Sequence, residues 1–237
     1  METRQFEDLT YTLRRSPRRQ TIGLTVERDG RLTVAAPDTC HERTIEKLLA
    51  EKRFWIYAKL AERNRLTATA VEREIVSGQG FPYLGRNYRL RLVTPAEATR
   101  GGQIEPLRWH HGYFLLLRSE QSNGREHFRC WYTERAGVKL RERVALYAPR
   151  LQVNPVGLRI TDLGYRWGSC SRNGTLYFNW RLILAPIRIV DYVVVHELLH
   201  LLAPHHTPEY WKLLRRSLPD FVERKQWLAE HGAELAV

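Results

Sequence analysis

The apolar run at residues 193–202, VVVHELLHLL, contains three ionisable side chains, His196, Glu197 and His200. We predict a helix from about 187 to 203 that is largely buried, because apolar residues surround these three groups on all sides. Burying ionisable groups without partners costs several kcal/mol. The fold must therefore enclose this helix and also give its polar groups a shared partner.

A metal ion is the partner that this spacing favours. On a helix, residues four apart lie about 40° round and about 6 Å along the axis, so His196 and His200 can reach one ion from one face. Glu197 lies about 100° round from His196, where it can meet a metal-bound water. Zinc lowers the pKa of such water to about 7, and a nearby carboxylate can take its proton while hydroxide attacks a carbonyl. The pattern predicts a zinc hydrolase with Glu197 as general base, although five-residue matches of this form also occur in ordinary helices.

A catalytic zinc normally has three protein ligands and one water, so a third ligand is needed. His206 follows His200 by six residues, the offset found in HExxHxxGxxH peptidases, although Ala203 stands where those enzymes have Gly. His205 and Glu209 are alternatives. Ligand spacing ranks them in the order His206, Glu209, His205.

The remaining sequence predicts an α+β protein. Strand-like alternation and helical spacing of apolar residues mark the elements. They are a hairpin at 21–36, a helix at about 40–64, strands at 88–92, 113–117, 158–163 and 175–179, a helix at 131–149, and two helices after Pro208 and Pro219. We expect a β-rich N-terminal region with one long helix at 1–128, followed at 129–237 by a catalytic core that combines the HExxH helix with a small mixed sheet.

Composition is typical of a folded water-soluble protein, with 43% hydrophobic and 27% charged residues in 237. No apolar run approaches the roughly 20 residues that span a bilayer, and the first residues lack the apolar core of a signal peptide. The three cysteines, Cys40, Cys130 and Cys170, form neither a CxxC motif nor a disulfide framework. We expect a cytoplasmic protein without membrane contact; the sequence contains no indication of its oligomeric state.

Charge gives a competing hypothesis. Lys and Arg number 38 against 26 Asp and Glu, a formal net charge of +12. Such an excess attracts nucleic acid or acidic partners. Its arginines are dispersed along the chain, which is a weaker indication than a basic stripe. The alternative is a nucleic-acid-associated protein in which zinc is structural.

Several motifs outside the helix accompany HELLH. They are RWGSCS at 166–171, NWRL at 179–182, AP at 185–186, DYVVV at 191–195 and HTPEYW at 206–211. With them the sequence resembles the YgjP-like predicted metal-dependent hydrolases, within the wider set of SprT-like and minimal gluzincin-like zinc peptidases. The resemblance implies a zincin-like core, a peptide or protein substrate, one zinc held by His196, His200 and His206, and Glu197 as base. Because SprT-like relatives act on proteins attached to DNA, it also joins the peptidase and nucleic-acid hypotheses.

Zincin folds pair an extended substrate with an edge strand above the metal, and 175–179 is the candidate for that strand. Cys170 and Ser169 lie in the WGSC segment, but the sequence offers no base for a thiolate and no triad partner for the serine. We expect Cys170 to be a structural cysteine. Trp211 and Trp227 are predicted to belong to the core.

Overall fold

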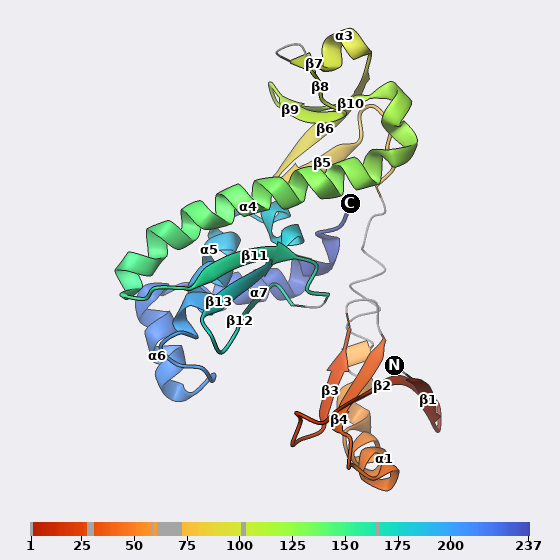
Figure 1. Ribbon diagram of the computed structural model, residues 1–237, viewed down its shortest axis with the longest axis vertical. Helices are drawn as coiled ribbons and strands as arrows, with labels where there is room; N and C mark the ends of the chain where they lie inside the picture. The colour runs from red at the N-terminus through yellow and green to blue at the C-terminus, as the bar shows by residue number, and fades with distance from the viewer. Residues whose placement is uncertain (1, 28–30, 58, 61–72, 101–102, 165) are drawn as a thin grey trace. The chain divides into compact units, whose positions relative to one another are not determined.

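The computed structural model describes residues 2–27, 31–57, 59–60, 73–100, 103–164 and 166–237 (Figure 1). Its contacts divide the chain into two compact units, Met1–Ala70 and Val71–Val237. Both units combine helices with strands, so the predicted α+β class is confirmed.

The first unit is a four-stranded sheet with a helix. Its elements are β1 (Glu2–Phe6), β2 (Leu9–Ser16), β3 (Gly23–Val26), β4 (Leu32–Pro37) and α1 (Glu42–Glu51), with strand order β1-β2-β4-β3. The predicted hairpin is present as the antiparallel pair β3–β4. The predicted helix at 40–64 corresponds to α1 and, after a turn at Lys52, to helical residues 53–57. Its end at 61–64 lies outside the described residues.

The second unit begins with a four-stranded sheet that packs on the longest helix, α4 (Gly124–Leu151). The strands are β5 (Gly80–Tyr83), β6 (Arg86–Val93), β9 (Leu107–His110) and β10 (Tyr113–Leu117), in the order β5-β6-β10-β9. Between them lie α3 (Pro95–Ala98), the short strands β7 (Thr99–Arg100) and β8 (Gln103–Ile104), and η1 (Arg118–Asn123), a 3-10 helix before α4.

The predicted domain division at 128/129 falls inside α4, where the structure shows continuous packing. The Phe128 ring stacks on Phe81 of β5 at a centroid distance of 4.0 Å and meets Phe114 of β10 edge-on at 5.0 Å. Both strands therefore share one hydrophobic core with α4 and the C-terminal helices. Along the sequence, the boundary between the compact units lies at 70/71, because this aromatic packing joins β5–β10 to the C-terminal half.

The C-terminal half contains a second sheet and the HExxH helix. Its elements are β11 (Gly157–Thr161), β12 (Gly168–Cys170), β13 (Thr175–Asn179), η2 (Trp180–Leu184), α5 (Ile187–Leu199), α6 (Pro208–Ser217), α7 (Phe221–His231) and η3 (Gly232–Glu234). The strand order is β11-β13-β12, with β11 parallel and β12 antiparallel to β13. In Figure 1, α4 runs between this sheet and the β5–β10 sheet.

Helix α5 is buried as its sequence predicts: ten of its 13 residues are buried. Arg143 of α4 fixes its position by a bidentate ion pair with Asp191, with Nε 2.6 Å from Oδ1 and Nη2 2.9 Å from Oδ2. The helix ends at Leu199, four residues before the predicted end. Leu202 and Ala203 donate their N–H groups back to the Leu199 carbonyl, which closes the helix before Pro204.

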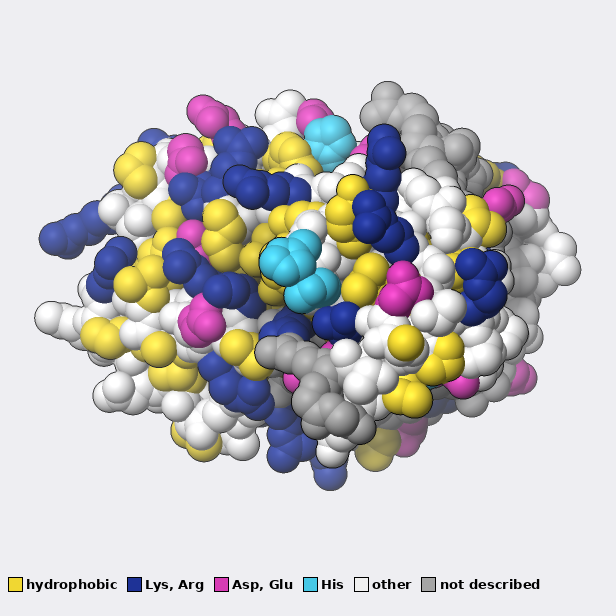
Figure 2. All heavy atoms as spheres, turned by 90° about the horizontal axis from the view of Figure 1, so that it is seen from above, with side chains coloured by type: hydrophobic (Ala, Val, Ile, Leu, Met, Phe, Trp, Pro, Cys, Tyr) yellow, Lys and Arg dark blue, Asp and Glu magenta, His cyan; other side chains and the backbone are white. Residues whose placement is uncertain are grey.

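One face of the molecule shows how the basic side chains are distributed. Figure 2 shows Lys and Arg spread over one face, with hydrophobic and His side chains between them. Among the described residues, no helix is both long and apolar enough to cross a membrane.

Candidate metal centre

Three histidines predicted from the sequence come together at the end of α5. His196 lies on the helix and His200 caps it, with ring centroids 5.0 Å apart. His206 reaches them from the loop before α6, with its centroid 5.0 Å from His196 and 4.8 Å from His200. One potential ligand atom from each ring lies within 4.8 Å of the other two.

The protonation of these rings suits a metal. Burial and the neighbouring histidines lower the pKa of His196 to about 3, and burial also lowers the pKa of His200 and His206. The neutral imidazole that this favours is the form that binds a metal. His200 Nδ1 donates to the Ala203 carbonyl at 3.2 Å, which leaves Nε2 for the cluster. His206 Nε2 lies 3.1 Å from His196 Nε2. The donor set therefore fits a metal ion.

Two aromatic residues hold the histidines in place, a role that was not predicted from the sequence. Tyr210 is fully buried, its ring stacks on His200 at 4.9 Å, and its hydroxyl donates to the His196 carbonyl at 3.0 Å. Trp211 stacks on His206 at 5.4 Å and donates Nε1–H to the His206 carbonyl at 3.2 Å. Trp211 is partly buried against the core, as predicted. The same side chain therefore packs in the core and holds His206. In the sequence, the EYW motif at 209–211 was the feature that could have indicated this role.

The alternative third ligands lie elsewhere. His205 and Glu209 are both exposed, and the metal-binding cluster found among the described residues contains neither. Thr207 explains the difference between the two adjacent histidines: its hydroxyl caps α6 by accepting from Tyr210 N–H, and its own N–H donates to the His205 carbonyl. With this turn, His206 lies against His196 and His200 although it is itself exposed.

Glu197 is buried, with 5% of its surface exposed, and faces strand β12. Burial raises its pKa to about 8, against the opposing effects of the Arg166 charge and of the Cys170 N–H, which donates to the carboxylate. A cation held by the adjacent histidines would lower this pKa, because opposite charge favours the ionised form.

Strand 175–179 is not the edge strand that we expected from the sequence. It is β13, the middle strand, with both sides taken by β11 and β12, because the RWGSC segment folds back on it antiparallel. The edge next to α5 is β12. The Trp167 carbonyl and the Ser171 N–H bond to β13, so alternation directs the Gly168 and Cys170 backbone groups outward, toward Glu197.

A groove of about 780 Å³ adjoins the histidines. Val156 and Leu202, 75% and 50% exposed, contribute apolar surface, and Arg172 and His205 contribute basic groups. His200 forms part of its wall, and no carboxylate is among its described lining residues. The groove therefore offers apolar surface with a basic border beside the metal centre.

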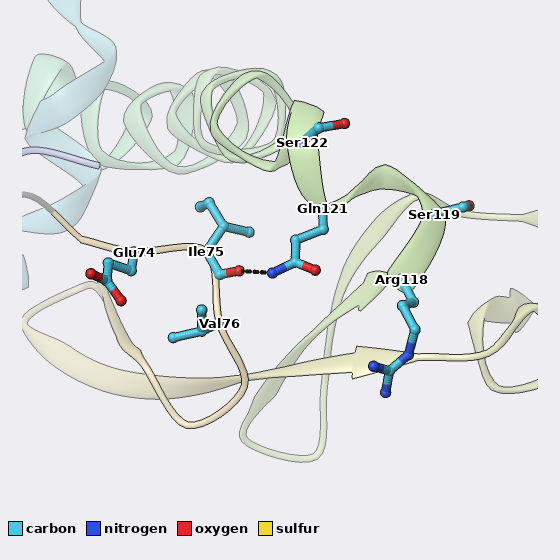
Figure 3. A pocket seen from close by; sticks show the side chains of 7 residues that line it. All are labelled: Glu74, Ile75, Val76, Arg118, Ser119, Gln121 and Ser122. Atoms are coloured by element: carbon cyan, nitrogen blue, oxygen red, sulfur yellow. Dashed lines mark hydrogen bonds between the residues drawn. The ribbon is translucent and has the colours of Figure 1, made fainter.

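A second hollow, of about 640 Å³, lies between residues 74–76 and η1 (Figure 3). Gln121 donates across it to the Ile75 carbonyl at 2.7 Å. Its described lining contains Glu74 and Arg118 as the charged groups and brings together no set of metal ligands. We assign no function to it.

A buried HExxH helix with a third histidine defines a candidate metallohydrolase site. The sequence model of the family described as "YgjP-like, metallopeptidase domain" matches residues 20–231, so the chain belongs to this metallopeptidase family. This confirms the resemblance inferred from the motifs. No curated protein matches the chain.

One solved structure is similar, the metallopeptidase zymogen of Pyrococcus abyssi abylysin. It shares 19% sequence identity, the match covers 37% of this chain and 89% of that chain, and the TM-score is 0.35. Because this structural similarity is low, the assignment of the chain to a family rests on the family match.

Proposed function

We propose that this chain is a zinc-dependent peptidase in which His196, His200 and His206 hold one zinc ion and Glu197 is the general base. The observation that carries the proposal is the meeting of three imidazoles, with potential ligand atoms within 4.8 Å of one another, on and beside the helix that carries the buried Glu197 carboxylate. Three imidazoles with an open fourth position are the ligand set of many catalytic zinc sites. When bound, zinc would supply a polarised carbonyl and a water of lowered pKa.

The protein's own groups account for the proton transfers and the binding of substrate. The Glu197 carboxylate takes a proton from the attacking water and passes it to the leaving amine. The Cys170 N–H fixes the orientation of that carboxylate. Apart from the Cys170 N–H, the outward backbone groups of β12 would pair with an extended peptide, as sheet edges do in other peptide complexes. Tyr210 and Trp211 hold the histidines in place through their main-chain carbonyls.

The groove beside His200 is the proposed site for a substrate side chain on one side of the cleaved bond. Its exposed Val156 and Leu202 favour a large apolar residue, and Arg172 favours an acidic residue next to it. The net charge is +12, and the face in Figure 2 shows Lys and Arg side chains dispersed among other residues; no contact of the described residues favours nucleic acid as a second function.

Digestion of a broad peptide library by the zinc-loaded protein tests both ideas. We expect cleavage at sites with a large apolar residue flanked by an acidic one. Arg172→Glu is expected to reverse the charge preference by roughly tenfold, and to leave the rate on neutral peptides unchanged, because Arg172 touches only the border of the groove. Absence of cleavage in every peptide would contradict the peptidase assignment, whereas an unchanged profile in Arg172→Glu would contradict the role of the groove alone.

A further inference from the structure

Glu197 approaches strand β12 more closely than a side chain at position 168 would permit. A Cβ atom added to Gly168 would lie 2.6 Å from both Cγ and Oε1 of Glu197 and 2.8 Å from Cδ. Carbon atoms in favourable contact lie about 3.5–4.0 Å apart. Gly168 lies in a regular strand, paired with Phe178. The glycine is therefore required for space at this position, where the strand conformation itself would admit other residues.

The surrounding elements leave little room for this contact to relax. Helix α5 cannot easily retreat, because Asp191 is held by the bidentate pair with Arg143 and the His196 carbonyl accepts from Tyr210. Strand β12 is tied to β13 on both sides of Gly168, through the Trp167 carbonyl and the Ser171 N–H. An added methyl group would therefore displace mainly the Glu197 side chain.

We propose that Gly168 is a positioning residue for Glu197: its missing side chain lets the carboxylate lie against β12. The assignment of a catalytic consequence rests on the proposed function of Glu197. The steric relation between the two residues does not, and it can be measured separately.

Gly157 provides a matched control. It lies on β11, at the opposite edge of the same sheet, and a Cβ added there would meet only the Thr175 methyl group, at 3.8 Å. Gly157→Ala thus makes the same chemical change in the same sheet without affecting Glu197.

The test is a double-mutant cycle of Gly168→Ala and Glu197→Ala, with Gly157→Ala as control. With Glu197 present, Gly168→Ala is expected to lower kcat about 100-fold, because a misplacement of about 1 Å has that effect on a catalytic group. Zinc content should stay at one equivalent. When Glu197→Ala is also present, all three atoms that would contact the added methyl group are absent, so Gly168→Ala should change the remaining kcat less than about threefold.

Thermal unfolding of the metal-free protein gives a readout that needs no activity. Gly168→Ala should lower Tm by about 5 °C with Glu197 present, as overpacking does, and by much less in the Glu197→Ala background. If Gly168→Ala fails to fold and the double variant folds, the proposed contact is supported; if neither folds, the contact with Glu197 is not the cause.

Equal losses in both backgrounds, or an equal loss in Gly157→Ala, would overturn the proposal, as would a Gly168→Ala variant with wild-type kcat and Tm. Failure of the proposed function is distinguishable from these outcomes. In that case the wild type shows no zinc-dependent hydrolysis, while the cycle in Tm still reports whether Gly168 and Glu197 are coupled.

Discussion

Replacing Glu197 with Gln is expected to lower kcat for peptide hydrolysis by about 10³-fold, within the range for loss of a general acid–base group. The amide has nearly the shape of the carboxylate and its oxygen can still accept from the Cys170 N–H, but it cannot take a proton from water. Because Glu197 is 5% exposed and faces β12, few other groups can substitute for it.

The measurement is single-turnover hydrolysis of a peptide identified in the library, together with zinc content by atomic emission. We expect the Glu197→Gln protein to keep one equivalent of zinc, since the three histidines are unchanged. A variant that retains both zinc and wild-type kcat would show that Glu197 is not the base. A variant that loses zinc would show that Glu197 takes part in metal binding.

The second large effect is expected from the adjacent residues His205 and His206. His206→Ala should weaken zinc binding by more than about 100-fold and abolish hydrolysis, since loss of a ligand exceeds the roughly 10–100-fold loss for an outer hydrogen-bond partner. His205→Ala is the matched control, because its side chain is exposed at the border of the groove and lies outside the histidine cluster.

Competition with a chromogenic chelator measures both zinc affinities. We expect His205→Ala to bind zinc like the wild type. The opposite order, with His205→Ala losing zinc and His206→Ala keeping it, would mean that the loop before α6 presents the other histidine to the metal. Equal affinities for all three proteins would limit the ligands to His196 and His200, with another group completing the site.

The sequence was sufficient to predict the elements that depend on local spacing. Helical periodicity places His196 and His200 on one face, and the peptidase offset singles out His206; the structure brings these three together. Local spacing also predicts the β3–β4 hairpin and the buried helix α5.

Features that depend on long-range packing could not be predicted in this way. The order β11-β13-β12 arises because RWGSC folds back on β13, and no local pattern in 175–179 distinguishes a middle strand from an edge strand. The stacking of Phe128 on Phe81 connects residues 47 positions apart, and both residues lie in the compact unit Val71–Val237. The role that we propose for Gly168 depends on its short distance to Glu197, which the sequence does not reveal.

If one zinc ion held by three histidines makes this chain a peptidase, hydrolysis must follow zinc loading. This is measured by titrating zinc into metal-stripped protein and following the rate of peptide hydrolysis at each addition. We expect no hydrolysis without metal and a linear rise that ends at one equivalent of zinc per chain. Hydrolysis by the fully stripped protein, or a rate that zinc does not restore, would contradict this expectation.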